Sequence, residues 1–305
     1  MTSGEGPPMR SATRGMWTLL EPIHALVYFD PICRSALEAA GLRGFWRGYF
    51  AGRAAPLGMA GPALVTAVFY TFAPRMVERA LPSVWELATP AQALEARVLG
   101  ATAALREVTP DPDLVSALAE LLWTTVSGAE TGGRPLGAAN AALDRPAEPY
   151  AALWQAATTI RELRGDGHVA ALVSCGVSGI EALVLRSALD LDRALLLQAR
   201  GWTQDEWSAA VERLAGRGWV TVAETPRITA AGRRVLAEVE ERTDLAAEPV
   251  WADLTARGTL TGLAAQLLPM ARRCAGRLPR VTPIGIGQPW DPVTEPAGAK
   301  ALVTR

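Results

Sequence analysis

The chain has 305 residues, half of them hydrophobic, with 30 basic and 31 acidic residues. This length predicts about two domains, at roughly 100–200 residues each. The net charge of −1 argues against a protein that mainly binds nucleic acid, because such proteins carry a clear basic excess. Three cysteines without a Cys-x-x-Cys pair and only two histidines argue against a disulfide framework or a metal site. No P-loop or nucleotide-binding glycine fingerprint appears either, so we expect no metal and no cofactor.

Two segments bear on where the protein resides. Residues 1–15 are polar and contain Gly and Pro, so we expect a disordered start and no signal peptide. The stretch 54–74 has no charge, but its unbroken part, 63–73, is shorter than the about 20 residues that cross a bilayer. We therefore expect a cytoplasmic protein without membrane contact, in which residues 63–73 form a buried helix.

Helix starts are marked by three pairs of a capping residue and a proline, namely Asp30-Pro31, Thr89-Pro90 and Asp111-Pro112. Asp and Thr side chains accept hydrogen bonds from first-turn amides, and proline fits the first helical position. Long Ala- and Leu-rich runs follow, without the alternation that is typical of strands. We predict a mainly all-α protein, with a multi-helix ligand-binding lobe at 16–145 and connecting helices at 146–189.

His24 and Tyr28 are four positions apart, so they share one face of a predicted helix. An imidazole and a phenol on such a face could line a pocket and exchange protons, which makes both candidate catalytic residues. The alternative interpretation is a core histidine that is satisfied by a single hydrogen bond.

The segment 43–53 combines arginines and aromatic residues with a glycine at every fourth position. Guanidinium groups capture carboxylates and phosphates and stack on rings, so we expect a small anionic or aromatic ligand. The alternatives are tight helix packing along the glycine stripe and ion pairing at an interface. The candidate ligand-binding residues are Trp46, Arg47, Tyr49, Arg53 and, further along the chain, Tyr70.

A second candidate group lies in a glycine-flanked segment, 164–168, which we predict to be a loop after a helix at 150–164. Asp166 could orient His168 as a general base. The alternative is that Asp166 caps the next helix and leaves His168 exposed.

Residues 190–276 show the element order of a winged helix and a following helix. A helix over 204–215 ends at glycines, residues 219–222 alternate as a strand, and residues 228–229 begin the return. The run 214–220, followed by Ile-Thr-Ala-Ala-Gly-Arg at 228–233, resembles the strand-and-wing end of MarR-type winged helices. That resemblance implies a small β-hairpin wing and a DNA-reading helix at 204–214.

The charges of this module depart from the MarR pattern. The reading helix begins with Asp205 and Glu206, where base and phosphate contacts are expected. Between residues 186 and 244 there are nine Arg and ten acidic residues. Because DNA affinity depends largely on neutralising phosphates, we expect a winged helix that no longer suits DNA and serves packing or dimerisation.

Several segments resemble an uncharacterised actinobacterial helix-turn-helix family, sometimes labelled SalK-like. They are 20–29, 41–58, Phe69-Tyr70 and 164–172. The resemblance implies two lobes and carries no activity. The tail at 277–305 is rich in Pro and Gly, and we expect it to be extended.

Three functions follow as hypotheses. The first is a small-molecule-binding protein of specialised metabolism, either a cofactor-free enzyme or a binding protein. The second is a MarR-like regulator that senses a ligand and binds DNA as a homodimer. The third is a protein–protein module without either activity.

Overall fold

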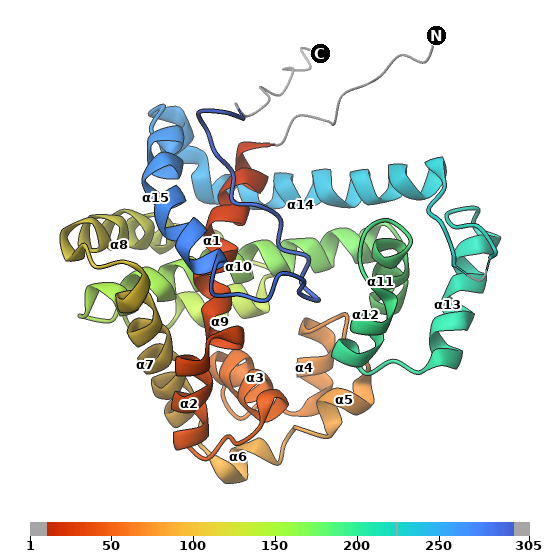
Figure 1. The fold of residues 1–305 in the computed structure, drawn as a ribbon, viewed down its shortest axis with the longest axis horizontal. Helices are drawn as coiled ribbons and strands as arrows, with labels where there is room; N and C mark the ends of the chain where they lie inside the picture. Colours follow the sequence, from red (N-terminus) through yellow and green to blue (C-terminus); the bar gives the residue numbers. More distant parts are fainter. Residues whose placement is uncertain (1–10, 224, 296–305) are drawn as a thin grey trace.

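The computed structural model describes residues 11–223 and 225–295, and in this part the chain folds into α-helices without a β-strand (Figure 1). The all-α prediction is confirmed. The helices before the central one are α1 (Ala12–Phe29), α2 (Pro31–Ala39), α3 (Phe45–Ala54), η1 (Ala55–Leu57), α4 (Pro62–Val68), α5 (Pro74–Glu78), α6 (Val84–Leu87), α7 (Pro90–Val108), α8 (Pro112–Ser127) and α9 (Pro135–Ala141). The central helix and those after it are α10 (Pro149–Ser174), α11 (Gly179–Ser187), α12 (Arg193–Arg200), α13 (Gln204–Gly216), α14 (Ala230–Ala256) and α15 (Leu260–Ala275).

The predicted helix starts are confirmed with their caps. Asp30 accepts a hydrogen bond from the amide of Ile32, and Asp111 accepts one from the amide of Leu114. Thr89 forms a reciprocal capping box with Gln92. In each case proline is the first residue of the helix, where its missing N–H has no intrahelical partner to lose.

Helix α10 organises the molecule, because α1, α7, α8, α9 and α14 all pack against it. It runs unbroken from Pro149 to Ser174, so the predicted loop at 164–168 is wrong. Gly167 serves packing: a Cβ there would lie 3.0 Å from the Cβ of Ala246 on α14. Close contact with α14 offsets the about 1 kcal/mol that this glycine costs inside the helix.

Both ends of the described chain are anchored. Helix α1 begins at Ala12 and is capped by Ser11, so the predicted disorder is wrong for residues 12–15, and residues 1–10 lie outside the described chain. The tail is free of helix from 277 to 295, as expected of an extended segment, yet it is fixed by Trp290. That indole is buried against Gly15, where a Cβ would come within 2.4 Å of its ring.

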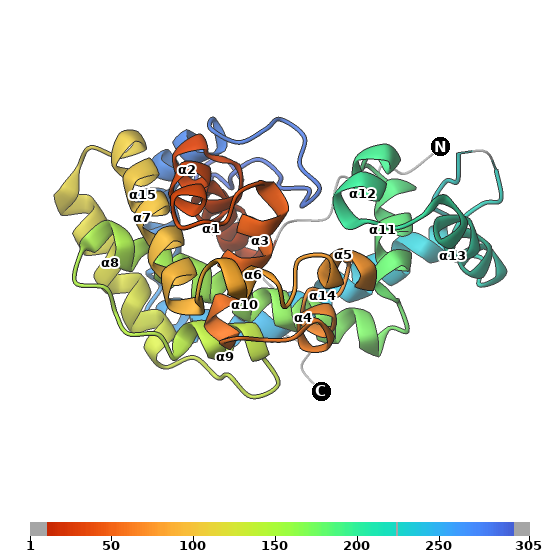
Figure 2. The same cartoon turned by 90° about the horizontal axis from the view of Figure 1, so that it is seen from below.

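Helices α11, α12 and α13 and the start of α14 form a small module at one end of the molecule (Figure 2). The predicted β-hairpin wing is wrong in the described residues, which contain a single antiparallel bridge between Val220 and Ile228. Flanking backbone hydrogen bonds join Thr221 to Arg227 and Thr229 to Trp219. The ladder ends there, because the amide of Arg227 donates to the hydroxyl of Thr221 and not to its carbonyl.

The hydrophobic packing divides the chain differently from the predicted domains. Helix α10 is part of the main core, not a connection, and α15 with the second half of α14 packs into the same core. A second core joins α3 to α7, and a third belongs to the small module and the last turn of α10. We call everything outside the small module the helical lobe.

Within the described residues, no single helix is long and apolar enough to cross a membrane, and α10 with α11 meets that criterion only as a pair bent by 93°.

Candidate functional site

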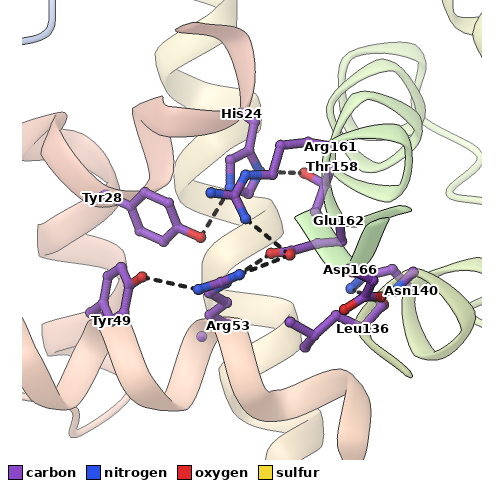
Figure 3. A network of polar contacts seen from close by, with 12 residues as sticks. His24, Tyr28, Tyr49, Arg53, Leu136, Asn140, Thr158, Arg161, Glu162 and Asp166 are labelled. Atoms are coloured by element: carbon purple, nitrogen blue, oxygen red, sulfur yellow. Dashed lines mark hydrogen bonds and ion pairs between the residues drawn. The ribbon is translucent and has the colours of Figure 1, made fainter. Parts of the chain in front are cut away.

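A cluster of buried charged and aromatic residues lies where α1, α3 and α10 meet (Figure 3). Four predicted site residues belong to it: His24, Tyr28, Tyr49 and Arg53. Sequence reasoning missed the residue at its centre, Glu162 of α10, which is 1% exposed. We call this group, together with Arg161, the buried cluster.

Glu162 is shared by two arginines. The Arg53 guanidinium donates from Nε and Nη2 to the two carboxylate oxygens at 2.9 and 3.0 Å, and Arg161 donates from Nη1 at 2.9 Å. Burial alone would raise the pKa of Glu162, but the positive charges of Arg53 and Arg161 hold it well below its ordinary value. Arg161 also donates to Glu21, which is fully buried. The carboxylate is therefore ionised in the core and compensated on both sides.

His24 is satisfied on both ring nitrogens. Its Nδ1 lies 3.0 Å from the Thr158 hydroxyl and its Nε2 lies 3.0 Å from the Tyr28 hydroxyl. Its ring also stacks on Trp154, with the centroids 6.2 Å apart. Burial, with a further contribution from Arg161, lowers the pKa of His24 well below its ordinary value, so the imidazole is neutral near pH 7. This geometry favours the core interpretation of His24, with two hydrogen bonds where one was expected.

Arg97 of α7 joins the same polar network, but none of its hydrogen-bond partners is a carboxylate. It donates to the carbonyl of Gly52 and to the side-chain oxygens of Asn140 and Gln155, each at 3.0 Å. It is 3% exposed, and burial lowers its pKa to about 10. A guanidinium with only neutral acceptors marks a place where the interior favours negative charge.

The cavity beside the buried cluster is small. Its walls include His24, Gly52, Arg53 and Arg97, and its volume is about 10 Å³. That is about the space of one water molecule. An anionic ligand at Arg53 would therefore need to displace Glu162 as well as create its own room.

The remaining predicted residues are dispersed. Trp46 packs on Phe72 and Tyr49 beside the buried cluster, whereas Arg47 is exposed on the far side of α3. Tyr70 donates to the carbonyl of Val177 at the boundary with the small module.

The other two candidate catalytic residues point in different directions from α10. His168 bonds to the Thr243 hydroxyl on α14 at 3.0 Å. Asp166 accepts a hydrogen bond from the backbone amide of Gly137 in the first turn of α9 at 2.8 Å. Asp166 thus supports a helix start, as its alternative interpretation held, although the helix is α9 and not the one that follows it.

We expect Asp166 to weaken the fold as pH rises. Burial raises its pKa from 3.8 to about 6, so the native state prefers the neutral acid. Its contribution is fully present below about pH 4 and is lost as pH rises through about 6, up to about 3 kcal/mol. Urea unfolding at pH 4 and pH 7 measures this effect. Between the two pH values, the free energy of unfolding of Asp166→Asn should rise relative to that of the wild type by about this amount. The exposed Asp113→Asn serves as the control, and an equal gain there would contradict the assignment.

The start of α13 is docked on the helical lobe. Glu206 accepts two hydrogen bonds from the guanidinium of Arg75 on α5, at 2.8 and 2.6 Å, and closes a capping box with Thr203. The hydrogen bond from Arg75, together with those from Thr203, lowers the pKa of Glu206 to about 2. Trp202 donates to the carbonyl of Thr71 at 2.9 Å. The turn between α12 and α13 therefore faces α5.

A family model described as a helix-turn-helix family matches residues 13–279. The chain belongs to this helix-turn-helix family. The match includes the helical lobe as well as the small module, so both are parts of one family unit. The narrower resemblance to SalK-like and MarR-type proteins stays a prediction. Searches of curated proteins and of solved structures find no match.

In this helix-turn-helix protein the exposed face of α13 lacks unpaired cations. Asp205 and Glu212 are exposed on it, and Arg213 is paired with Glu181 at 3.1 Å. Arg217, just beyond the helix, bonds to the same Glu181. Helix α13 therefore presents carboxylates outward, and Arg213 and Arg217 are engaged within the module.

A larger groove lies on the helical lobe between α7 and the segment that joins α9 to α10, with a volume of about 450 Å³. Sequence reasoning missed it, because Leu and Val on amphipathic helices give no signal beyond core packing. Its most buried lining residue is Gln155, which bonds to Arg97. The groove is lined by Leu94, Glu95, Val98, Leu99, Thr102, Leu143, Asp144, Pro146, Glu148, Ala151 and Gln155.

Proposed function

We propose that this protein binds a small, largely apolar molecule in its helical lobe, and that its helix-turn-helix module is a packing element. The single observation that carries the proposal is the groove of about 450 Å³ between α7 and α10. Small-molecule sites have volumes of about 300–1,000 Å³, with mostly apolar walls and a few polar groups. This groove fits that description, with Thr102 and Gln155 as polar groups among aliphatic walls and the carboxylates of Glu95, Asp144 and Glu148 also in its lining.

The buried cluster supports the site in this proposal without holding the ligand. Its cations are compensated by Glu21 and Glu162, and the adjoining cavity has room for about one water molecule. Arg97 connects it to the groove, because this guanidinium contacts both Gln155 and the backbone of α3. We propose no reaction, since both ring nitrogens of His24 are engaged within the core.

The proposal is tested with N-phenyl-1-naphthylamine, a neutral apolar dye whose fluorescence rises in apolar sites. We expect saturable binding of one dye per chain, and we expect Val98→Trp to weaken it at least about tenfold by filling the groove. Val173→Trp, at an exposed position on α10, is the matched control and should bind as the wild type does. Equal binding by Val98→Trp and the wild type would contradict the groove as the site.

A ligand-responsive MarR-like regulator that binds DNA as a homodimer is the second candidate, and membership of a helix-turn-helix family favours it. The Arg75–Glu206 contact and the carboxylates of α13 argue against DNA reading in this arrangement. A low-salt gel shift against the neighbouring promoter separates the two candidates. Saturable retention of DNA by the wild type would reverse their order.

A further inference from the structure

The carboxylates at the rim of the groove are not engaged by the protein. Glu95 on α7 and Asp144 before α10 are both exposed, and neither has a hydrogen bond or ion pair within residues 11–223 and 225–295. The third carboxylate, Glu148, is occupied: it caps α10 at the amide of Ala151 and pairs with Arg106 at 3.1 Å. Two negative charges are therefore available at the mouth.

The lining of the groove provides no cation to pair with these carboxylates, because none of its eleven residues is basic. Arg145 follows Asp144 directly, but its guanidinium bonds to Glu120 on α8 and lies over the ring of Trp123. Arg106 is held by Glu148. The exposed arginines beside the groove thus have carboxylate partners, and the buried Arg97, whose partners are neutral oxygens, is not one of the lining residues.

The walls of the groove determine which kind of surface the uncharged part of the ligand must have. Leu94, Val98 and Leu143 provide aliphatic surface for an apolar body. The hydroxyl of Thr102 is buried in the wall and has no hydrogen-bond partner among the described residues. Carboxylates beside an apolar wall attract a cation more strongly than carboxylates in open water do, because the local dielectric constant is lower.

We infer that the groove selects a monocationic amine on an apolar body. This inference rests on the proposed function and names its ligand class: the ammonium group lies between Glu95 and Asp144, and the apolar body lies along α7. It differs from the anionic ligand expected from the arginines of α3, whose buried member is paired with Glu162.

The test uses three probes that share one ring system and differ in charge: 1-naphthylmethylamine, 1-naphthalenemethanol and 1-naphthoate. Isothermal titration at low salt should rank the amine above the alcohol by about tenfold, because two exposed carboxylates each contribute a modest attraction. The carboxylate probe should bind more weakly than the alcohol. Raising the salt concentration should reduce the advantage of the amine.

The double variant Glu95→Gln/Asp144→Asn should lower affinity for the amine to that for the alcohol and leave the alcohol unchanged. Exposed Glu86→Gln/Asp113→Asn is the matched control and should keep the preference for the amine. If the alcohol binds the groove as well as the amine does, the ligand class is overturned while the proposed function stands. If neither these probes nor the neutral dye binds, the proposed function itself fails.

Discussion

We expect Glu162→Gln to lower the free energy of unfolding by about 3–5 kcal/mol, the range seen when one partner of a buried ion pair is removed. Gln keeps the shape of the side chain but leaves Arg53 facing a neutral amide in the core. Arg161 keeps Glu21 and loses its second carboxylate. Urea unfolding followed by far-UV circular dichroism measures the loss.

Glu120→Gln is the matched control, because Glu120 makes a two-point contact with Arg145 on an exposed surface. Exposed pairs contribute little to stability because water and salt screen them, so this variant should unfold close to the wild type. A Glu162→Gln protein as stable as Glu120→Gln would show that the buried cluster is open to water.

The second large effect is expected from Gly179→Ala, at the first residue of α11. A Cβ there would lie 2.0 Å from the carbonyl oxygen of Tyr70 and 3.2 Å from the Cα of Thr71. Both are backbone atoms, so no side-chain rotation relieves the clash. Because the segment is also fixed by the Trp202 hydrogen bond to Thr71, we expect a loss of about 3 kcal/mol, at the upper end of overpacking effects.

Gly262→Ala is the matched control: it makes the same chemical change, but we expect it to raise the free energy of unfolding. Gly262 lies in α15, and a Cβ there would meet no atom within 4 Å. Ala is the better helix former by about 1 kcal/mol, so this variant should be more stable than the wild type. If Gly179→Ala were also stabilising, the contact between α11 and the end of α4 would be looser than the structure has it.

Local signals in the sequence predicted the helices well. The caps Asp30, Thr89 and Asp111 act through hydrogen bonds within three residues, so their pattern can be read without the fold. The same holds for His24 and Tyr28, whose spacing of four placed their side chains in contact. The glycines at 165 and 167 favoured a loop where α10 is continuous, because Gly167 allows close contact with a helix about eighty residues later in the chain.

Partners distant in sequence could not be predicted. Arg53 and Glu162 are 109 positions apart, and nothing in either local segment favours the other as a partner. The same is true of Arg75 and Glu206, which are 131 positions apart. The acidic start of α13 departs from the MarR pattern in the sequence alone, but the docking of Glu206 on α5 could be found only in the tertiary structure.

The docking of α13 bears on what membership of the helix-turn-helix family implies for this chain. The match shows membership of a helix-turn-helix family, and the turn between α12 and α13 is held against the helical lobe by Arg75 and Trp202. Fold membership alone does not establish function, which depends on the chemistry that a surface presents. Here the surface of α13 presents Asp205 and Glu212.

The anchoring of α1 by the end of the chain has a consequence for synthesis. Almost every residue of α1 is buried, and its partners include α10, α14, α15 and Trp290. A growing chain makes α1 before these partners, so the part of its apolar surface that α15 and Trp290 cover stays without native contacts until those residues have been made. Contacts this far apart slow folding and leave partly made chains prone to aggregation. We therefore expect partly made chains that end before α15 to aggregate more readily than the full chain.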